Sequence, residues 1–281
     1  MKKFKVAIIG SGFGLSSHLP AFKKNKYCKV IAVCTRNSKK NLLIKKKYNI
    51  EYCFNKWEEM LNIVKPDIVS IATPPNEQKK IINSCLKKSI SIFAEKPLAI
   101  NIKDSKKIFL LQKKKKVPCT INFLFPEFPE WIYVKKILRK KTYGNIRNIN
   151  VDLSYQSYLN YKKKNSWKNN INKGGGIVHN IVCHIFYYLE WFNEPIHSVS
   201  SYLYNEKNYK YIGHTNSIII IKFKSGTFGT IKASNNVLGL NKHIIKFYND
   251  YGTIVIENKS SDWVNGFNVK IINKSLLKKK N

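Results

Sequence analysis

FKVAII at residues 4–9 is a short apolar run. It stops at GSGFGL, residues 10–15, which contains three closely spaced glycines. A predicted helix over 17–26 and a second apolar run over 29–34 complete a strand–turn–helix–strand unit. A dinucleotide-binding turn needs glycine so that backbone N–H groups approach a pyrophosphate at a helix N-terminus. We therefore expect a Rossmann fold, with the cofactor bound at Gly10, Ser11, Gly12, Phe13, Gly14 and Leu15.

The alternation of strands and helices continues to residue 123. Helices are predicted over 38–48, 56–64, 76–88 and 101–115, and strands over 51–54, 67–72, 91–94 and 117–123. Strands that alternate with helices form a parallel sheet covered on both faces. This pattern predicts a doubly wound, NAD(P)-binding Rossmann domain over residues 1–122.

The pattern changes after residue 123. Helices are predicted over 130–141 and 177–192, and strands over 146–154, 196–204, 215–224, 227–234, 243–249 and 252–257. Consecutive strands with short turns indicate an antiparallel sheet. We expect residues 123–281 to form an α+β domain with an open, largely antiparallel sheet for substrate binding and oligomerisation. Apolar residues on both alternating positions predict a homodimer or homotetramer packed through this sheet.

The end of the second predicted strand indicates which nicotinamide cofactor is used. An acid normally binds the ribose hydroxyls of NAD there, but this chain has Thr35 and Arg36, followed by lysines. A hydroxyl and a guanidinium suit a 2′-phosphate better. We expect NADP(H) to be preferred and NAD(H) to be the alternative, unless Arg36 merely stacks on adenine.

The sequence AEKPL at residues 94–98 directly follows a predicted buried strand. Ligands of open α/β sheets bind at the carboxyl ends of strands, which places Lys96 in the crevice. Together with GSGFG at 10–14, HLPA at 18–21, ATPP at 72–75 and GGGI at 174–177, this segment resembles the Gfo/Idh/MocA oxidoreductase family. The resemblance covers nearly the whole chain, in the family's order and spacing.

This resemblance implies an enzyme that transfers hydride between NAD(P)(H) and a secondary alcohol or ketone of a sugar, nucleotide sugar or polyol. Lys96 matches the lysine of the family's E-K-P motif, and His184 matches the histidine that commonly exchanges the proton. The two would flank the reacting carbon as the catalytic pair. The resemblance also implies substrate contacts at Lys96, Trp167, Asn180 and His184, and further cofactor contacts at Ala72, Thr73, Pro74, Glu95 and Lys96.

Four positions depart from the family pattern. Leu15 replaces the third glycine, and Gln78 stands where T-P-P-x-x-H has histidine. Asn180 and Tyr187 stand where the family commonly has aspartates. The second domain is expected to be C-terminally short. These departures keep open a second hypothesis, a catalytically weakened NAD(P)-binding protein on the same fold.

The composition narrows the remaining classes of function. The net charge is +35, but only Arg36, Arg139 and Arg147 among the 51 basic residues are arginines. Nucleic-acid readers favour arginine, so codon bias explains the charge better than a nucleic-acid partner does. A basic protein that binds polyanions stays open as an alternative.

Cysteine spacing and hydropathy indicate the compartment. The six cysteines lie far apart and form no C-x-x-C pair, which argues against a zinc site or a disulfide framework. No apolar run reaches the roughly 18–20 residues that span a bilayer. We expect a cytoplasmic protein without a membrane partner or a metal.

Overall fold

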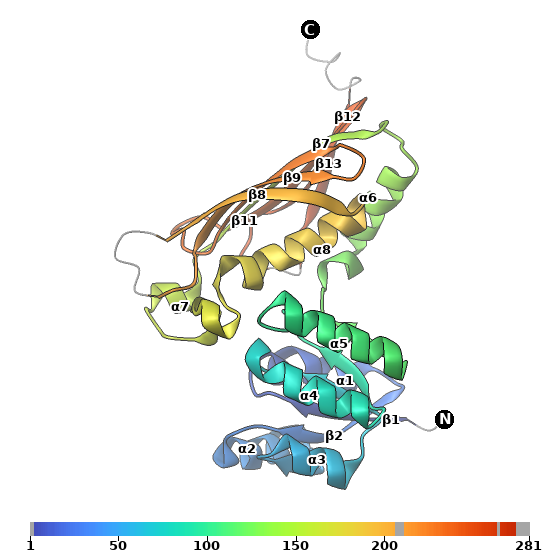
Figure 1. Cartoon of the computed structure of the whole chain (residues 1–281), viewed down its shortest axis with the longest axis vertical. Coiled ribbons are helices and arrows are strands. Elements are labelled where there is room, and N and C mark those ends of the chain that lie inside the picture. The colour runs from blue at the N-terminus through green and yellow to red at the C-terminus, as the bar shows by residue number, and fades with distance from the viewer. Residues whose placement is uncertain (1–2, 206–210, 263–264, 274–281) are drawn as a thin grey trace. The chain divides into compact units, whose positions relative to one another are not determined.

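The computed structural model describes residues 3–205, 211–262 and 265–273. The chain divides into two compact units, Met1–Asn122 and Phe123–Asn281 (Figure 1).

The first unit is a parallel sheet of six strands in the order β3-β2-β1-β4-β5-β6. The strands are β1 (Phe4–Ile9), β2 (Cys28–Cys34), β3 (Tyr52–Phe54), β4 (Ile68–Ile71), β5 (Ser91–Ala94) and β6 (Cys119–Ile121). The connections are a π-helix (Gly14–His18) and helices α1 (Leu19–Lys24), α2 (Ser38–Tyr48), α3 (Trp57–Val64), α4 (Pro75–Lys87) and α5 (Ile102–Lys115). This strand order reverses beside β1, which puts a topological switch point at the glycine turn.

Helices cover both faces of this sheet, as the near-continuous apolar strands require. Val6, Ile8 and Val33 pack on one face against helix residues such as Leu19 of α1 and Ile44 of α2. The other face packs against α3, α4 and α5 through a larger cluster that includes Met60, Ile81, Ile82, Leu86 and Ile108. Because the six strands are parallel, their carboxyl ends lie at one edge of the sheet.

The second unit is a sheet of seven strands in the order β13-β12-β11-β7-β10-β9-β8. They are β7 (Ile146–Ser154), β8 (Ile196–Tyr204), β9 (Asn216–Phe223), β10 (Phe228–Ser234), β11 (Lys242–Asn249), β12 (Gly252–Asn258) and β13 (Asn268–Asn273). The pair β7–β10 is parallel and the other pairs are antiparallel. The prediction of an α/β protein with a Rossmann sheet and a second, largely antiparallel sheet is confirmed.

Helices α6 (Pro129–Arg139) and α8 (Cys183–Phe192) cover one face of the second sheet (Figure 1). The strands alternate accordingly: Ile219 and Ile221 of β9 are buried in the shared core, whereas Ile218 and Ile220 are each 50% exposed. Trp131 of α6 is buried completely in that core. The opposite face of the sheet therefore presents apolar side chains that nothing in the described part of this unit buries.

Several elements differ from their predicted bounds. The helix expected over 17–26 is a π-helix followed by the short α1, and the helix expected over 177–192 is a π-helix (Val178–Val182) followed by α8. Both π-helices follow or contain closely spaced glycines, and such segments are frequent at functional sites. Strand β13 and the short helix α7 (Tyr158–Tyr161) were not predicted; α7 has only four residues, too few to show a clear period.

Candidate functional site

The glycine turn after β1 is built for close approach. Gly10 has φ of +122°, and a Cβ on it would lie 2.3 Å from the carbonyl oxygen of Ala72, so only glycine fits. A Cβ on Gly12, by contrast, would meet no atom within 4 Å. Ser11, Gly12 and Phe13 are exposed. The turn thus presents open backbone at the carboxyl edge of the sheet.

Gly14 explains why Leu15 is tolerated at the position of the family's third glycine. A Cβ on Gly14 would lie 3.2 Å from both Ile8 Cγ2 and Ala72 Cβ, so Gly14 supplies the close contact between helix and strand. Leu15 is half-buried and packs against the cluster of α1 and α2. The departure shifts the tight contact by one residue and leaves the turn intact.

Of the two residues that follow β2, Thr35 is buried and Arg36 is exposed. Thr35 is buried, and its hydroxyl donates to Asn41 Oδ1 at 2.8 Å, which fixes the start of α2. Arg36 is 80% exposed, and its Nη2 lies 3.2 Å from Glu77 Oε2 in the first turn of α4. Of the two predicted cofactor residues, only Arg36 presents its polar group on the surface. Glu77 is a neighbour that the sequence did not suggest.

The end of β4 offers a second group to a ligand. Ala72 continues the sheet by donating its N–H to Ile9 O, and Pro74 precedes the first turn of α4. Between them, Thr73 Oγ1 is buried and has no hydrogen-bond partner within the described residues. A buried hydroxyl without a partner is costly unless a ligand satisfies it. The open glycine turn and this hydroxyl together fit a dinucleotide.

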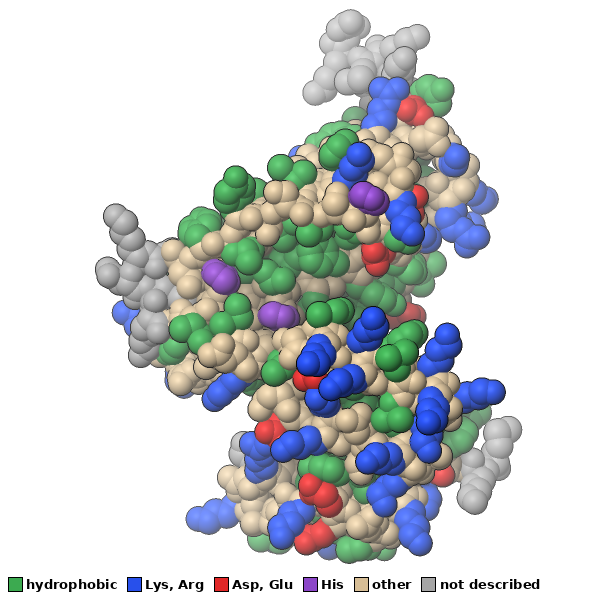
Figure 2. All heavy atoms as spheres, in the orientation of Figure 1, with side chains coloured by type: hydrophobic (Ala, Val, Ile, Leu, Met, Phe, Trp, Pro, Cys, Tyr) green, Lys and Arg blue, Asp and Glu red, His purple; other side chains and the backbone are tan. Residues whose placement is uncertain are grey.

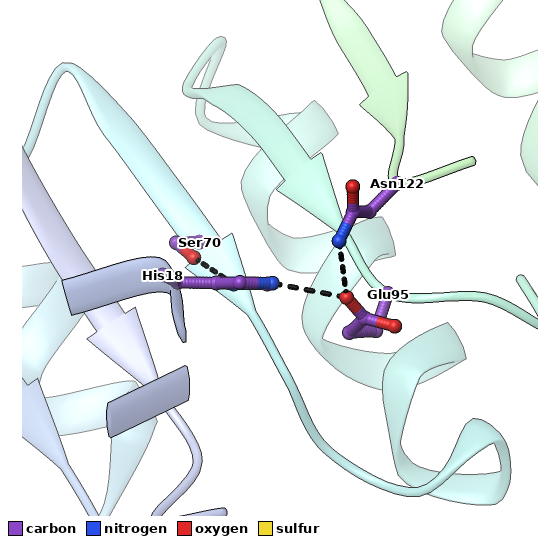
Figure 3. A network of polar contacts seen from close by, with 4 residues as sticks. All are labelled: His18, Ser70, Glu95 and Asn122. Atoms are coloured by element: carbon purple, nitrogen blue, oxygen red, sulfur yellow. Dashed lines mark hydrogen bonds and ion pairs between the residues drawn. The ribbon is translucent and has the colours of Figure 1, made fainter. Parts of the chain in front are cut away.

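A buried polar network joins the ends of β4, β5 and β6 (Figure 3). His18, the last residue of the first π-helix, lies with Nδ1 2.7 Å from Ser70 Oγ and with Nε2 3.0 Å from Glu95 Oε1. Asn122 Nδ2 donates to the same carboxylate oxygen at 2.6 Å. Ser70 and Asn122 were not singled out from the sequence, because nothing local distinguishes a serine within a strand or an asparagine at its end.

Lys96 follows Glu95 at the carboxyl end of β5 and is half-buried. The Lys96–Pro97 peptide bond is cis. Gln78, fully buried in α4, donates from Nε2 to Pro97 O at 2.8 Å. The glutamine that replaces the family histidine thus holds the turn that carries Lys96.

In the second unit, His184 lies in the first turn of α8 and is 7% exposed. Its ring makes edge contacts with Phe123 and Phe125, with centroid distances of 5.5 and 5.3 Å. Tyr187, where the family commonly has an aspartate, stacks on Phe123 at 4.2 Å. Aromatic rings therefore fix the orientation of the His184 ring.

The remaining two predicted substrate residues are brought together by the glycine run. A Cβ on Gly175 would lie 2.1 Å from Trp167 O, so only glycine lets the two segments pack. Asn180 is buried, and its Nδ2 donates to Lys168 O at 2.7 Å and to Gly176 O at 3.1 Å. Trp167 itself is half-buried at the start of a short 3₁₀ helix (Trp167–Asn169).

His243 is a second buried histidine in this unit. Its Nε2 lies 3.0 Å from the hydroxyl of Tyr188, and burial lowers the pKa of His243 to about 3. An imidazole with so low a pKa stays neutral near pH 7 and suits a core position. The sequence alone does not separate His243 from His184.

One groove on the described surface has none of the candidate residues in its lining. This groove of about 900 Å³ opens at the amino-terminal edge of the first sheet, beside Phe4, Ile68 and Pro118.

Within the described residues there is no cluster of metal-ligating side chains and no helix able to cross a membrane. Figure 2 shows lysine and arginine side chains interspersed with acidic and apolar ones on the visible face, not gathered into one basic stripe.

Two family models match the chain in succession. The model of the GFO_IDH_MocA oxidoreductase family, with an NAD-binding Rossmann fold, matches residues 4–123. The model of the GFO/IDH/MocA C-terminal domain matches residues 131–255.

Individual proteins resemble the chain over most of its length. An uncharacterized oxidoreductase of Synechocystis is 25% identical over 276 residues, which cover 94% of this chain and 74% of that protein. The WlbA dehydrogenase of Chromobacterium violaceum, solved with NADH and UDP-GlcNAcA, superposes with a TM-score of 0.87 at 18% identity and covers 98% of this chain and 78% of its own. A putative NADPH-dependent oxidoreductase of Desulfitobacterium hafniense gives a TM-score of 0.89 at 17% identity, over 98% and 81% of the two chains.

Proposed function

Because the chain belongs to the GFO/IDH/MocA family of NAD-binding oxidoreductases, we propose that it transfers hydride to or from a secondary alcohol or ketone of a sugar, nucleotide sugar or polyol. The nicotinamide, when bound, supplies or accepts the hydride. The nucleotide sugar bound to the Chromobacterium violaceum enzyme supports this substrate class. The six cysteines form no disulfide within the described residues, which supports a reducing, cytoplasmic setting.

The observation that carries the proposal is the composition of the carboxyl edge of the first sheet. Gly12 leaves open space for a pyrophosphate, and the buried Thr73 hydroxyl has no hydrogen-bond partner among the residues that the structure describes. The turn that carries Lys96 follows β5 at the same edge, next to β4. A cofactor site and a cationic side chain thus share the edge at which open α/β sheets bind their ligands.

We assign the chemistry of the substrate to two residues. Oxidation of an alcohol removes the proton of the O–H group while hydride leaves the carbon that carries this group. An imidazole titrates near pH 6.5 and suits this proton transfer, so His184 would accept the proton and return it in reduction. The ammonium of Lys96 would bind the substrate oxygen and stabilise the negative charge that develops on it. Trp167 and Asn180 would line the substrate.

A specific observation keeps the weakened-enzyme hypothesis as a second candidate. The positions where relatives commonly have aspartates hold Asn180, whose amide binds two backbone carbonyls, and Tyr187, which stacks on Phe123. No carboxylate at either position stabilises a protonated imidazole. Such a protein would bind the cofactor and turn over slowly.

One experiment separates the candidates. NADP and NAD are titrated into the purified chain by calorimetry, and reduced cofactor is then followed optically with a panel of sugars, nucleotide sugars and polyols. Binding with turnover supports the proposed oxidoreductase, and binding without turnover supports the weakened enzyme. A chain that binds neither nucleotide contradicts both.

A further inference from the structure

The two residues on either side of Lys96 are both held by side chains from other elements. His18 and Asn122 bind the Glu95 carboxylate, and Gln78 binds Pro97 O. We propose, on the basis of the function above, that His18 and Gln78 are positioning residues that fix the Glu95–Pro97 turn and thereby the reactive Lys96.

The hydrogen bonds around His18 define its proton positions. A carboxylate only accepts, so His18 Nε2 donates to Glu95 Oε1 at 3.0 Å. In the neutral ring, Nδ1 is then the acceptor for the hydroxyl of Ser70 at 2.7 Å. The Glu95 carboxylate thus selects the tautomer, and the Ser70 hydroxyl donates to the other ring nitrogen. The ring has one orientation in which both contacts form.

Burial strengthens these hydrogen bonds. The His18 side chain is 3% exposed and that of Glu95 is 14% exposed, so water competes weakly for their polar atoms. Hydrogen bonds to a charged group in such a setting are stronger and shorter than those between neutral groups. The His18 ring also packs edge-on against Phe93 of β5 at 5.1 Å, which restricts its movement.

The same ring contacts the cofactor turn. Phe13 lies edge-on to His18 at a centroid distance of 5.5 Å, and the π-helix that ends at His18 begins at Gly14. His18 therefore touches the glycine turn on one side and the carboxylate beside Lys96 on the other. His18 can therefore hold the glycine turn and the Glu95–Pro97 turn in fixed positions relative to each other.

A serine, a histidine and a glutamate linked by hydrogen bonds resemble the catalytic triad of a hydrolase, but the arrangement of Ser70, His18 and Glu95 excludes that role. Ser70 is completely buried in β4, so no substrate reaches its hydroxyl. Its Oγ contacts Nδ1, and the carboxylate contacts Nε2. The contacts serve position and not nucleophilic attack.

The test uses the full chain and five variants, His18→Leu, His18→Gln, Ser70→Ala, Gln78→Leu and Gln112→Leu. Gln112 is the matched control, because its Nε2 donates to Val117 O at 2.8 Å in the same unit but away from Lys96. A displacement of about 1 Å at a reacting group can cost on the order of a hundredfold in rate. We expect kcat to fall about ten- to a hundredfold in His18→Leu and Gln78→Leu, with cofactor Kd within about threefold of wild type in Gln78→Leu, whose hydrogen bond is to Pro97 O.

His18→Gln retains a donor toward Glu95 and should recover part of the lost kcat, a rescue that a purely structural role would not give. Ser70→Ala, the mildest change, should lower kcat by about fivefold through loss of one hydrogen bond. Gln112→Leu should leave kcat as in wild type. Folded His18→Leu and Gln78→Leu with wild-type kcat would overturn the proposal, as would an equal loss in Gln112→Leu.

A second measurement works without a substrate. Hydrogen exchange at the backbone amides of Glu95, Lys96 and Leu98 should speed up about tenfold or more in His18→Leu and Gln78→Leu, because a charge-assisted or buried bond is lost. If His18→Leu does not fold, His18→Gln and Ser70→Ala carry both measurements. Failure of the wild type to turn over any substrate refutes the proposed function, and unchanged exchange at these amides refutes the positioning role.

Discussion

Arg36 and Glu77 form an ion pair of 3.2 Å that joins the end of β2 to the first turn of α4. In this fold, the loop after β2 binds the ribose that carries the 2′-phosphate of NADP. We therefore expect Arg36 to be shared between this protein carboxylate and the 2′-phosphate. Because the pair is exposed, its own contribution to stability is small.

The first prediction concerns cofactor choice. Arg36→Ala should lower affinity for NADP about ten- to a hundredfold and leave affinity for NAD nearly unchanged, because a charge-assisted hydrogen bond contributes about 1.5–3 kcal/mol. Glu77→Gln should raise NADP affinity about two- to fivefold, because it removes a competing negative charge. Calorimetric titration of both nucleotides measures this.

Glu51→Gln is the control for Glu77, because Glu51 belongs to another exposed pair of the first unit, with Lys29. Tighter binding of NAD than of NADP by wild type would contradict the predicted preference. Equal effects of Glu51→Gln and Glu77→Gln would show that the gain reflects net charge alone.

The second prediction concerns self-association through the exposed face of the second sheet. Ile218 and Ile220 of β9 are half-exposed, and Tyr202 of β8, paired with Ile218, is 76% exposed. An apolar face of this kind is usually covered by a partner. We expect a homodimer or homotetramer that Ile220→Lys dissociates, measured by sedimentation.

Leu43→Glu is a suitable control, since Leu43 in α2 is 67% exposed and lies in the first unit. It should leave the assembly unchanged. A wild-type monomer at micromolar concentration would be decisive evidence against association through this sheet.

The third prediction concerns stability at acidic pH. Burial lowers the pKa of His243 to about 3, whereas the unfolded chain has a histidine pKa near 6.5. Between these values the unfolded state binds one more proton, so stability is complete above about pH 6.5 and falls toward pH 3. The slope contributed by this residue is at most about 1.4 kcal/mol per pH unit.

Urea unfolding at pH 7.5 and 5.0 measures the effect. His243→Gln should lower stability at neutral pH but lessen the further loss at pH 5.0. His197→Gln, at an exposed histidine of β8, should leave the loss as in wild type. An unchanged pH dependence in His243→Gln would refute the assignment.

The fold could be predicted from local patterns because its strands and helices have strong periods. Residues 4–9 and 91–94 read as strands and 38–48 as a helix, and the structure forms β1, β5 and α2 over those ranges. The π-helices could not be predicted, since each has only five residues, too few to establish a period of its own. Strand β13 was missed because its pairing with β12 comes from tertiary contact.

The candidate site was harder to predict, because it depends on contacts between distant segments. Glu95 was expected to bind the cofactor, but its partner His18 lies 77 positions away and Asn122 lies 27 positions away. Thr35 was expected to face the cofactor, yet its hydroxyl binds Asn41. Sequence identifies residue types at strand ends, and only packing decides which polar atoms stay available.

The fourth prediction concerns Asn180. Its amide nitrogen donates to the carbonyls of Lys168 and Gly176, so Asn180→Asp removes both donors and sets a carboxylate against two carbonyl oxygens. A buried acceptor left without a donor costs about 1–3 kcal/mol. We expect a lower thermal midpoint and slower turnover. Asn172→Asp in the exposed 3₁₀ helix nearby (Ile171–Lys173) is the control, and an unchanged midpoint in Asn180→Asp would contradict the structural role.

The fifth prediction concerns the catalytic pair. His184→Asn removes the group that exchanges the proton but keeps a polar side chain of similar width among Phe123 and Phe125. Removal of a general base costs roughly 10²–10⁴ in rate. Lys96→Ala removes the cation that stabilises the developing alkoxide and should cost a similar factor. Turnover is measured with the best substrate of the sugar panel, and cofactor affinity by calorimetry.

His197→Asn and Lys103→Ala are the controls, because both residues are exposed, on β8 and α5. They should turn over as wild type does. Proton transfer by His184 also predicts that the acid limb of the pH–kcat profile, set by the imidazole, disappears in His184→Asn, whereas loss of packing alone would lower the whole profile. Lys96→Ala should keep that limb, since the base is intact. Unchanged turnover in His184→Asn would refute the assignment of the base, and unchanged turnover in Lys96→Ala would refute the site.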